Sequence, residues 1–312
     1  MTLALESRQK RFFQESGGFR ITAHPAHNRL YRVHFAETAL RAFFAACAAI
    51  DVQQLEYVPY MRFIVARALA DAAGPPLRDA LRAILCDRAS GGFATGAGNV
   101  SAEAADYVKL ATAVSHLVGP ANHDAMSGTY YARFIVQDTD ASDSYLRQAY
   151  RTLTLHTDGT FVDETTDWLL LMKFAERHAA GGESRLLHLD DWDELTRFVE
   201  HPLARHPFAY KPAASKNVGA VLRRTTFYER DDRPCLCFID QFAYPETIAE
   251  AAYLQALSAS MEGSAATTTV ALPVGDLFML NNGFWIHGRA AFRKHPEVHR
   301  ELMRQRGAFA KD

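Results

Sequence analysis

The sequence lacks the features that would place it in a membrane, in an oxidising compartment or on nucleic acid. Its 312 residues include only four cysteines, Cys47, Cys86, Cys235 and Cys237, with no C-x-x-C spacing, which is typical of a reduced, cytoplasmic protein. No run of about 18 apolar residues is present to span a membrane, and the N-terminal region has no apolar signal core. With 34 basic and 36 acidic residues the net charge is −2, without the basic excess of a nucleic-acid binder.

The composition that remains is that of a globular enzyme with a large core. Hydrophobic residues make up 48% of the chain and charged residues 22%. A chain of this length buries most of the surface that it exposes when unfolded. No internal repeat or low-complexity segment interrupts it. We therefore predict a single domain over residues 1–312.

The apolar pattern changes character along the chain. Residues 1–28 are polar and contain glycine, which predicts a loose N-terminal arm. Residues 29–120 are rich in helical periodicity, whereas 121–312 contain mostly short β-rich runs. In the first part we expect a strand over 30–35, helices over 38–50, 60–86 (interrupted at 74–76) and 102–117, and a small-residue loop over 91–98. In the second part we expect strands over 130–136, 151–155, 168–174, 185–189, 235–239, 267–270, 277–280 and 301–309, with helices over 190–199 and 248–261.

Helices first and strands later, without regular βαβ alternation, favour a mainly antiparallel β core with flanking helices. We expect an α+β fold whose core, residues 121–312, is a double-stranded β-helix of the jelly-roll group. The stretch 201–219 contains proline and lysine in a long irregular region, which is typical of an active-site lid.

Two histidines and an aspartate have the spacing of a metal site. His156 and Asp158 lie two apart in the run LHTDGT, and His287 ends the apolar run NNGFWIH. In an extended strand, residues two apart point to the same face, so both side chains converge on one point. Two imidazoles and one carboxylate on one side of a metal form the facial triad of non-haem Fe(II) oxygenases, with open positions for cosubstrate and O2. The alternative interpretation is a strand end that carries two polar residues.

Such Fe(II) sites need a 2-oxoacid cosubstrate, and its distal carboxylate needs a fixed cation. Arginine suits this best because its fork binds a carboxylate through two hydrogen bonds. Arg300, Arg304 and Arg306 share one face if the C-terminal run is extended. The alternative is a solvated basic helix face, in which Arg300 and Arg304 are one turn apart. Three cations exceed the need of one dicarboxylate tail, so a second anionic ligand is expected.

The sequence also resembles a known family, the CsiD family of glutarate 2-hydroxylases, which are relatives of taurine dioxygenase. The resemblance covers roughly residues 100–310, and the N-terminal third is less similar. The matching runs, besides the His156 motif, are 108–114, 124–128, 130–134, 142–148, 187–192, 239–242 and 300–307.

The resemblance implies an Fe(II)- and 2-oxoglutarate-dependent dioxygenase that hydroxylates glutarate to L-2-hydroxyglutarate and releases succinate and CO2. It also implies a place in bacterial lysine degradation and a homotetramer. The iron ligands carry over to His156, Asp158 and His287. Patterns of taurine dioxygenase favour Arg300 for 2-oxoglutarate and Arg304 for the substrate anion, while the family's own terminal R-Q-R leaves Arg306 open.

Further residues and three alternative functions complete the prediction. Ser127, Arg133 and Tyr145 are candidates for positioning a small dicarboxylate. A related oxygenase acting on another small carboxylate is one alternative. A metal-dependent hydrolase is another, because zinc accepts the same ligands and activates water. A non-catalytic metal-binding protein of the same fold is the third.

Overall fold

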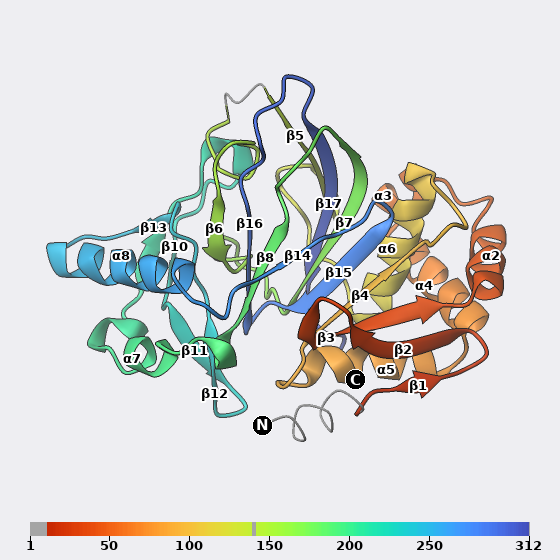
Figure 1. Ribbon diagram of the computed structural model, residues 1–312, viewed down its shortest axis with the longest axis horizontal. Helices are drawn as coiled ribbons and strands as arrows, with labels where there is room; N and C mark the ends of the chain where they lie inside the picture. Colours follow the sequence, from red (N-terminus) through yellow and green to blue (C-terminus); the bar gives the residue numbers. More distant parts are fainter. Residues whose placement is uncertain (1–10, 139–141, 312) are drawn as a thin grey trace.

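The computed structural model describes residues 11–138 and 142–311, which form two facing β-sheets flanked by helices (Figure 1). The α-helices are α2 (Glu37–Ala46), α3 (Val52–Tyr57), α4 (Pro59–Ala73), α5 (Pro76–Cys86), α6 (Ala104–Val118), α7 (Leu195–Val199) and α8 (Ile248–Glu262). The 3-10 turns are η1 (Leu189–Asp191), η2 (Pro202–Arg205) and η3 (Ala214–Lys216). Within the described residues no helix is both long and apolar enough to cross a bilayer.

The strands fall into two main sheets and two small ribbons. They are β1 (Gln14–Glu15), β2 (Phe19–His24), β3 (His27–Phe35), β4 (Gly92–Gly96), β5 (Ala132–Gln137), β6 (Leu153–His156), β7 (Trp168–Arg177), β8 (Ser184–His188), β9 (Phe208–Tyr210), β10 (Leu222–Arg224), β11 (Phe227–Arg230), β12 (Arg233–Leu236), β13 (Ala243–Tyr244), β14 (Thr268–Val270), β15 (Asp276–Asn281), β16 (Trp285–Arg289) and β17 (His299–Gly307). The larger sheet has the order β1-β2-β3-β4-β15-β7-β17-β5 and the smaller sheet β14-β8-β16-β6. The pairs are antiparallel except β3 with β4. This is the expected α+β fold with a jelly-roll core.

The central strands of the larger sheet pack on two cores at once. In β15, Leu277 and Met279 belong to the core under the helices, whereas Phe278 and Leu280 belong to the core between the sheets. Successive residues of a strand point to opposite faces, so a strand that is apolar throughout contributes side chains to both cores. Truncating Phe278, which is 2% exposed, to alanine removes contacts worth about 3–5 kcal/mol. The helices α2 to α6 gather on one side of this sheet (Figure 1).

The break between the two helices expected over 60–86 is confirmed, and its cause is local. Helix α4 ends at Gly74, whose φ of 103° lies in the left-handed region that glycine tolerates. Pro76 then opens α5, where the missing N–H of proline costs nothing. The helix expected over 102–117 and that over 248–261 are also present, as α6 and α8.

Two expectations for the N-terminal part are wrong. Residues 14–24 are not a loose arm, because they form β1 and β2 at the edge of the larger sheet; residues 1–10 lie outside the described residues. The small-residue loop expected over 91–98 is instead the buried strand β4, which joins β3 to β15. A Cβ atom at Gly92 would lie 2.6 Å from the Leu30 side chain and 2.7 Å from that of Leu280. Small residues are therefore required here by packing and do not mark a turn.

Two expectations for the later part need correction as well. The helix expected over 190–199 is reduced to η1 followed by the short α7. The strand expected over 235–239 ends at Leu236 as β12. In both cases a short apolar run predicts a longer regular element than the folded chain forms.

Candidate active site

The three residues expected to bind a metal are brought together by the smaller sheet. His156 ends β6, and His287 lies directly opposite it on β16. The ring centroids of the two histidines are 4.3 Å apart, and His156 Nε2 lies 3.8 Å from Asp158 Oδ1. One ligand atom from each of the three side chains lies within 4.8 Å of the others. The register shifts after His287 at Gly288, where a Cβ atom would be 2.6 Å from the carbonyl oxygen of Leu153.

Backbone and amide contacts fix the orientation of these ligands. The Nδ1–H of His156 donates to the carbonyl of Thr154 at 2.7 Å, which leaves its Nε2 lone pair for a metal. The Asp158 N–H donates to Asn282 Oδ1 at 2.9 Å, and Asn282 Nδ2 donates back to the Asp158 carbonyl at 2.9 Å. Asn282 was not predicted as a site residue, although it lies in the same NNGFWIH run as His287.

The protonation states of the cluster suit a cation. Burial, followed by the neighbouring His156, lowers the pKa of His287 to about 3, so this imidazole is neutral at pH 7. Burial alone raises the pKa of the Asp158 carboxyl, but Arg304 and the other cationic groups outweigh it and hold that pKa below its usual range. Asp158 Oδ2 is buried without a hydrogen bond among the described residues. A neutral His287 imidazole, an ionised Asp158 carboxylate and a carboxylate oxygen without a hydrogen bond among the described residues fit a divalent metal.

Two arginines of β17, Arg304 and Arg306, lie close to a second buried carboxylate, that of Asp124. Arg304 is 3.4 Å from Asp158 Oδ2 and 2.8 Å from Asp124 Oδ2. Arg306 is 3.7 Å from the same Asp124 oxygen, and its guanidinium lies over the ring of Phe161. All four charged side chains are nearly inaccessible to solvent. Asp124, which sequence reasoning did not single out, is thus the counter-ion of two arginines.

Arg300 has a different environment from Arg304. It is 3% exposed, and its guanidinium donates to the carbonyl of Gly182. Within residues 11–138 and 142–311 it makes no ion pair, and its Nε has no hydrogen-bond partner. Burial lowers the pKa of Arg300 to about 10, so it remains charged at neutral pH. This guanidinium can accept an external carboxylate without giving up a protein partner.

A cavity opens beside these groups between the two sheets. The ionisable side chains that line it are Arg289, Arg300, Arg304, Asp158 and the two histidines. The remaining lining residues are Phe134, Val136, Leu146, Leu153, Leu171, Ser184, Gly288 and Leu302. Arg300, Leu302 and Arg304 all face the cavity because they alternate along β17. Arg306 lies further along the strand and is not part of this lining.

The three further candidates for substrate positioning lie outside this lining. Arg133 alternates with the lining residue Phe134 on β5 and pairs with Glu301 at 2.6 Å on the outer face. Strand alternation therefore turns Arg133 away from the cavity. Ser127 is exposed and Tyr145 is half-buried. Neither belongs to the lining, although the adjacent Leu146 does.

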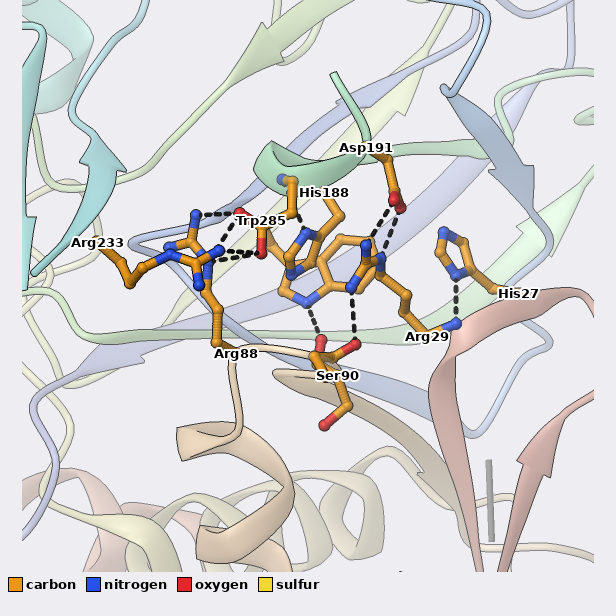
Figure 2. A network of polar contacts seen from close by, with 10 residues as sticks. His27, Arg29, Arg88, Ser90, His188, Asp191, Arg233 and Trp285 are labelled. Carbon is orange, nitrogen blue, oxygen red and sulfur yellow. Dashed lines mark hydrogen bonds and ion pairs between the residues drawn. The ribbon is translucent and has the colours of Figure 1, made fainter. Parts of the chain in front are cut away.

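A network of ion pairs and hydrogen bonds connects η1, which follows β8 directly, to distant parts of the chain (Figure 2). Arg29 forms two hydrogen bonds to Asp191, of 2.6 and 2.5 Å, and Arg88 contacts Asp190 at 2.6 Å. Arg233 adds a contact of 3.0 Å to Asp190. These arginines come from β3, from the segment after α5 and from β12, so one turn, η1, ties three distant segments together. Asp190 and Asp191 are thus the ion-pair partners of these three arginines.

The same network holds the start of β16. The indole N–H of Trp285 donates to the Ser90 carbonyl at 2.7 Å (Figure 2). Trp285 pairs with His188 of β8 in register, and their rings are 5.1 Å apart and perpendicular. Since Trp285 lies two residues before His287 on the same strand, this bracing also positions a candidate metal ligand.

Comparisons with solved structures agree with the fold. The chain is similar to an asparagine oxygenase in complex with Fe(II), 2S,3S-3-hydroxyasparagine and succinate, with a TM-score of 0.69, 16% identity, and coverage of 88% of this chain and 93% of that one. It is also similar to the non-haem iron oxygenase OrfP in complex with Fe and alpha-ketoglutaric acid, with a TM-score of 0.68, 16% identity, and coverage of 89% and 93%. These similarities show the shared jelly-roll fold, and a set of two histidines and one carboxylate is the ligand set typical of non-haem Fe(II) oxygenases.

The family follows from the sequence itself. The CsiD family matches residues 19–309, which is most of the chain. This protein therefore belongs to the CsiD family. The match begins at Phe19, the first residue of β2, so β2 and β3 are part of the shared region and β1 precedes it.

Proposed function

We propose that this protein is an Fe(II)- and 2-oxoglutarate-dependent dioxygenase that hydroxylates glutarate to L-2-hydroxyglutarate, with succinate and CO2 as coproducts. His156, Asp158 and His287 would hold the iron. When bound, iron supplies the redox chemistry by which one oxygen atom of O2 enters the substrate and the other enters succinate. The rest of the reaction depends on how the protein binds and orients two carboxylate ligands.

The observation that supports this proposal is the excess of positively charged side chains among the residues that line the cavity. Among its described lining residues, three arginines face a single carboxylate, Asp158, and that carboxylate is a candidate metal ligand. An amino-acid substrate brings an ammonium group, which needs an anionic or carbonyl partner that is not a metal ligand. A dicarboxylate brings two anions and no cation. The lining therefore favours a dicarboxylate over the amino-acid product present in the similar asparagine oxygenase structure.

The arginines divide naturally between two ligands. Arg300 has no carboxylate partner among the described residues, whereas Arg304 is already paired with Asp124 and Asp158. We propose that Arg300 anchors the distal carboxylate of 2-oxoglutarate and that Arg304 faces the substrate anion, with Arg306 keeping Asp124 ionised. Leucine and phenylalanine side chains of the lining exclude water from the carbon chains of both ligands.

The test is a panel of dicarboxylates of neighbouring chain length, incubated with Fe(II), 2-oxoglutarate, ascorbate and O2. We expect stoichiometric succinate and 2-hydroxyglutarate with glutarate, and less with shorter or longer diacids. Succinate formed only with a different carboxylate would replace glutarate as substrate. Turnover of an ester or amide without 2-oxoglutarate would favour the metal-dependent hydrolase instead.

We also propose that the protein is a cytoplasmic homo-oligomer that acts in lysine degradation. An apolar surface patch on α3 and α4 supports the association: Tyr57, Tyr60, Phe63 and Ile64 are 73%, 68%, 49% and 48% exposed. Such side chains grouped on a surface mark interaction sites. Light scattering should give the mass of an oligomer, and Tyr60→Glu with Phe63→Glu should reduce it. A monomer in the wild type would remove this part of the proposal.

A further inference from the structure

A second group of side chains has the composition of a metal site. Within residues 11–138 and 142–311, the His156 cluster is joined by one more set of three possible ligands: His178, His295 and Glu297. As in the active site, one ligand atom from each side chain lies within 4.8 Å of the others. The rings of His178 and His295 stack with centroids 4.2 Å apart and planes 5° apart. The proposed function uses none of these three residues.

The separation of the ligand atoms suits a small divalent ion. Zinc binds histidine nitrogen and carboxylate oxygen at about 2.0–2.2 Å, which places two ligands of a tetrahedral site about 3.3–3.5 Å apart. His178 Nε2 lies 3.2 Å from Glu297 Oε2, close to that value. The side chains of His178 and Glu297 are 49% and 74% exposed, so both are free to turn toward His295. Three protein ligands leave the fourth position of the tetrahedron to water.

The backbone brings the three residues together without a metal. Arg177 and His299 are the last pair in the register of β7 with β17, so the chain leaves both strands at the same end of the sheet. His178 follows β7 directly with a left-handed φ of 49°, a conformation that histidine adopts more readily than most residues. The Tyr150 hydroxyl lies 3.1 Å from the carbonyl oxygen of His295 and 3.3 Å from its amide nitrogen. Metal binding therefore needs only side-chain rotation.

One hydrogen bond in the group opposes metal binding. The Glu297 N–H donates to His295 Nδ1 at 3.1 Å, so in this state the proton of the neutral ring is on Nε2. Coordination at Nδ1 displaces the N–H, and coordination at Nε2 moves the ring proton to Nδ1, so either mode gives up this bond. Because Glu297 is exposed, water can accept from the released N–H, and the loss is small.

We propose that His178, His295 and Glu297 form a second metal site, which binds a divalent ion of the zinc class and ties the end of β7 to the segment before β17. The inference goes beyond the proposed function and does not depend on it. Nitrogen and oxygen sites generally bind Zn(II) more tightly than Fe(II), so this exposed site selects zinc.

The bound ion would stabilise the turn that contacts Arg300. His178 begins the segment 178–182, in which the Ala180 carbonyl accepts from the Arg293 N–H at 2.8 Å. At its other end, the Gly182 carbonyl accepts from the Arg300 guanidinium. A metal between His178 and His295 adds a third tie between this segment and the chain that leads into β17.

The test is equilibrium dialysis of metal-stripped protein against Zn(II). We expect two equivalents bound to wild type and one to Asp158→Ala, in which the active-site cluster has lost its carboxylate. Adding His178→Asn or Glu297→Gln to Asp158→Ala should weaken the remaining equivalent by about tenfold or more, since even indirect partners of a metal ligand matter that much. His206→Asn is the matched control: His206 lies 3.6 Å from Glu250 but belongs to neither three-ligand group of the described residues. It should change nothing.

Thermal unfolding separates metal binding from damage to the fold. Without metal, His178→Asn should keep the Tm of its parent, because the side chain is exposed and asparagine tolerates the left-handed backbone. Zn(II) should raise the Tm of Asp158→Ala but not that of Asp158→Ala with His178→Asn. A second equivalent that survives His178→Asn or Glu297→Gln would overturn the inference. So would a wild type that binds only the one equivalent lost in Asp158→Ala. Neither result alters the succinate and 2-hydroxyglutarate assay, which tests the proposed function separately.

Discussion

Replacing Arg300 or Arg304, the two arginines of β17 that line the cavity, by methionine should have different consequences for the ligand-free protein. Arg300 donates to one carbonyl, that of Gly182, and makes no ion pair among the described residues. Arg304 lies 2.8 Å from Asp124 and 3.4 Å from Asp158. Arg300→Met therefore leaves one carbonyl without a donor, whereas Arg304→Met leaves two buried carboxylates without their nearest cation.

The expected magnitudes follow from these contacts. Removing one partner of a buried ion pair costs about 3–5 kcal/mol of unfolding free energy, which we expect for Arg304→Met. Loss of the donor to Gly182 costs about 1–3 kcal/mol at most. For ligands, losing a charge-assisted contact of about 2–5 kcal/mol means roughly 30-fold or more in KM. Arg300→Met should therefore affect ligand KM more than stability. Lysine should rescue poorly because it lacks the planar fork.

The assay combines urea unfolding with steady-state kinetics in which 2-oxoglutarate and the diacid are varied in turn. Arg133→Met is the matched control, because Arg133 pairs with Glu301 on the outer face of the sheet. We expect it to leave both KM values unchanged. If Arg304→Met unfolds like wild type, the buried ion-pair reasoning is wrong. If Arg300→Met and Arg304→Met both keep their KM values within about threefold, far below the expected loss, β17 is not the anion-binding strand.

Three further predictions concern the metal, the pH and the bracing network. Asp158→Ala should abolish stoichiometric Fe(II) binding in equilibrium dialysis while circular dichroism stays unchanged; retained binding would remove this residue from the ligand set. Burial lowers the pKa of His188 to about 3 and that of His27 to about 4, so the unfolded chain takes up more protons below pH 6.5. Stability should fall by ~2 kcal/mol per histidine between pH 7.5 and 5, and equal urea midpoints at both pH values would contradict it. Trp285→Phe leaves the carbonyl of Ser90 unpaired and should cost ~1–3 kcal/mol and weaken metal affinity, which a combined Tm and dialysis measurement checks.

The sequence was most informative where its signal is local. The spacing of His156 and Asp158 on one strand, and the alternation of Arg300 and Arg304, depend only on the two-residue period of an extended chain. The helix break at Gly74 depends only on backbone conformations open to glycine. These features could be read without knowing which strands pair.

The local sequence pattern predicted the wrong element where contacts with distant segments determine the structure. The small residues of β4 are typical of a loop, yet they form a strand that pairs with β3 and β15, and Leu30 and Leu280 leave no room for a larger side chain at Gly92. Residues 14–24 read as an arm, yet pairing with β3 makes them a sheet edge. Composition alone does not reveal which neighbour a segment will meet.

By itself, the sequence determined the jelly-roll class and the three residues that converge as candidate metal ligands, because period and motif spacing are properties of the chain. Only the tertiary structure decided which charges meet in the site. Asp124 is far from the metal motif along the chain, and Arg133 is turned away by strand alternation. Burial and electrostatic pairing depend on contacts between distant segments, so only the tertiary structure identifies Asp124 as the counter-ion and Arg300 as the arginine without an ion pair among the described residues.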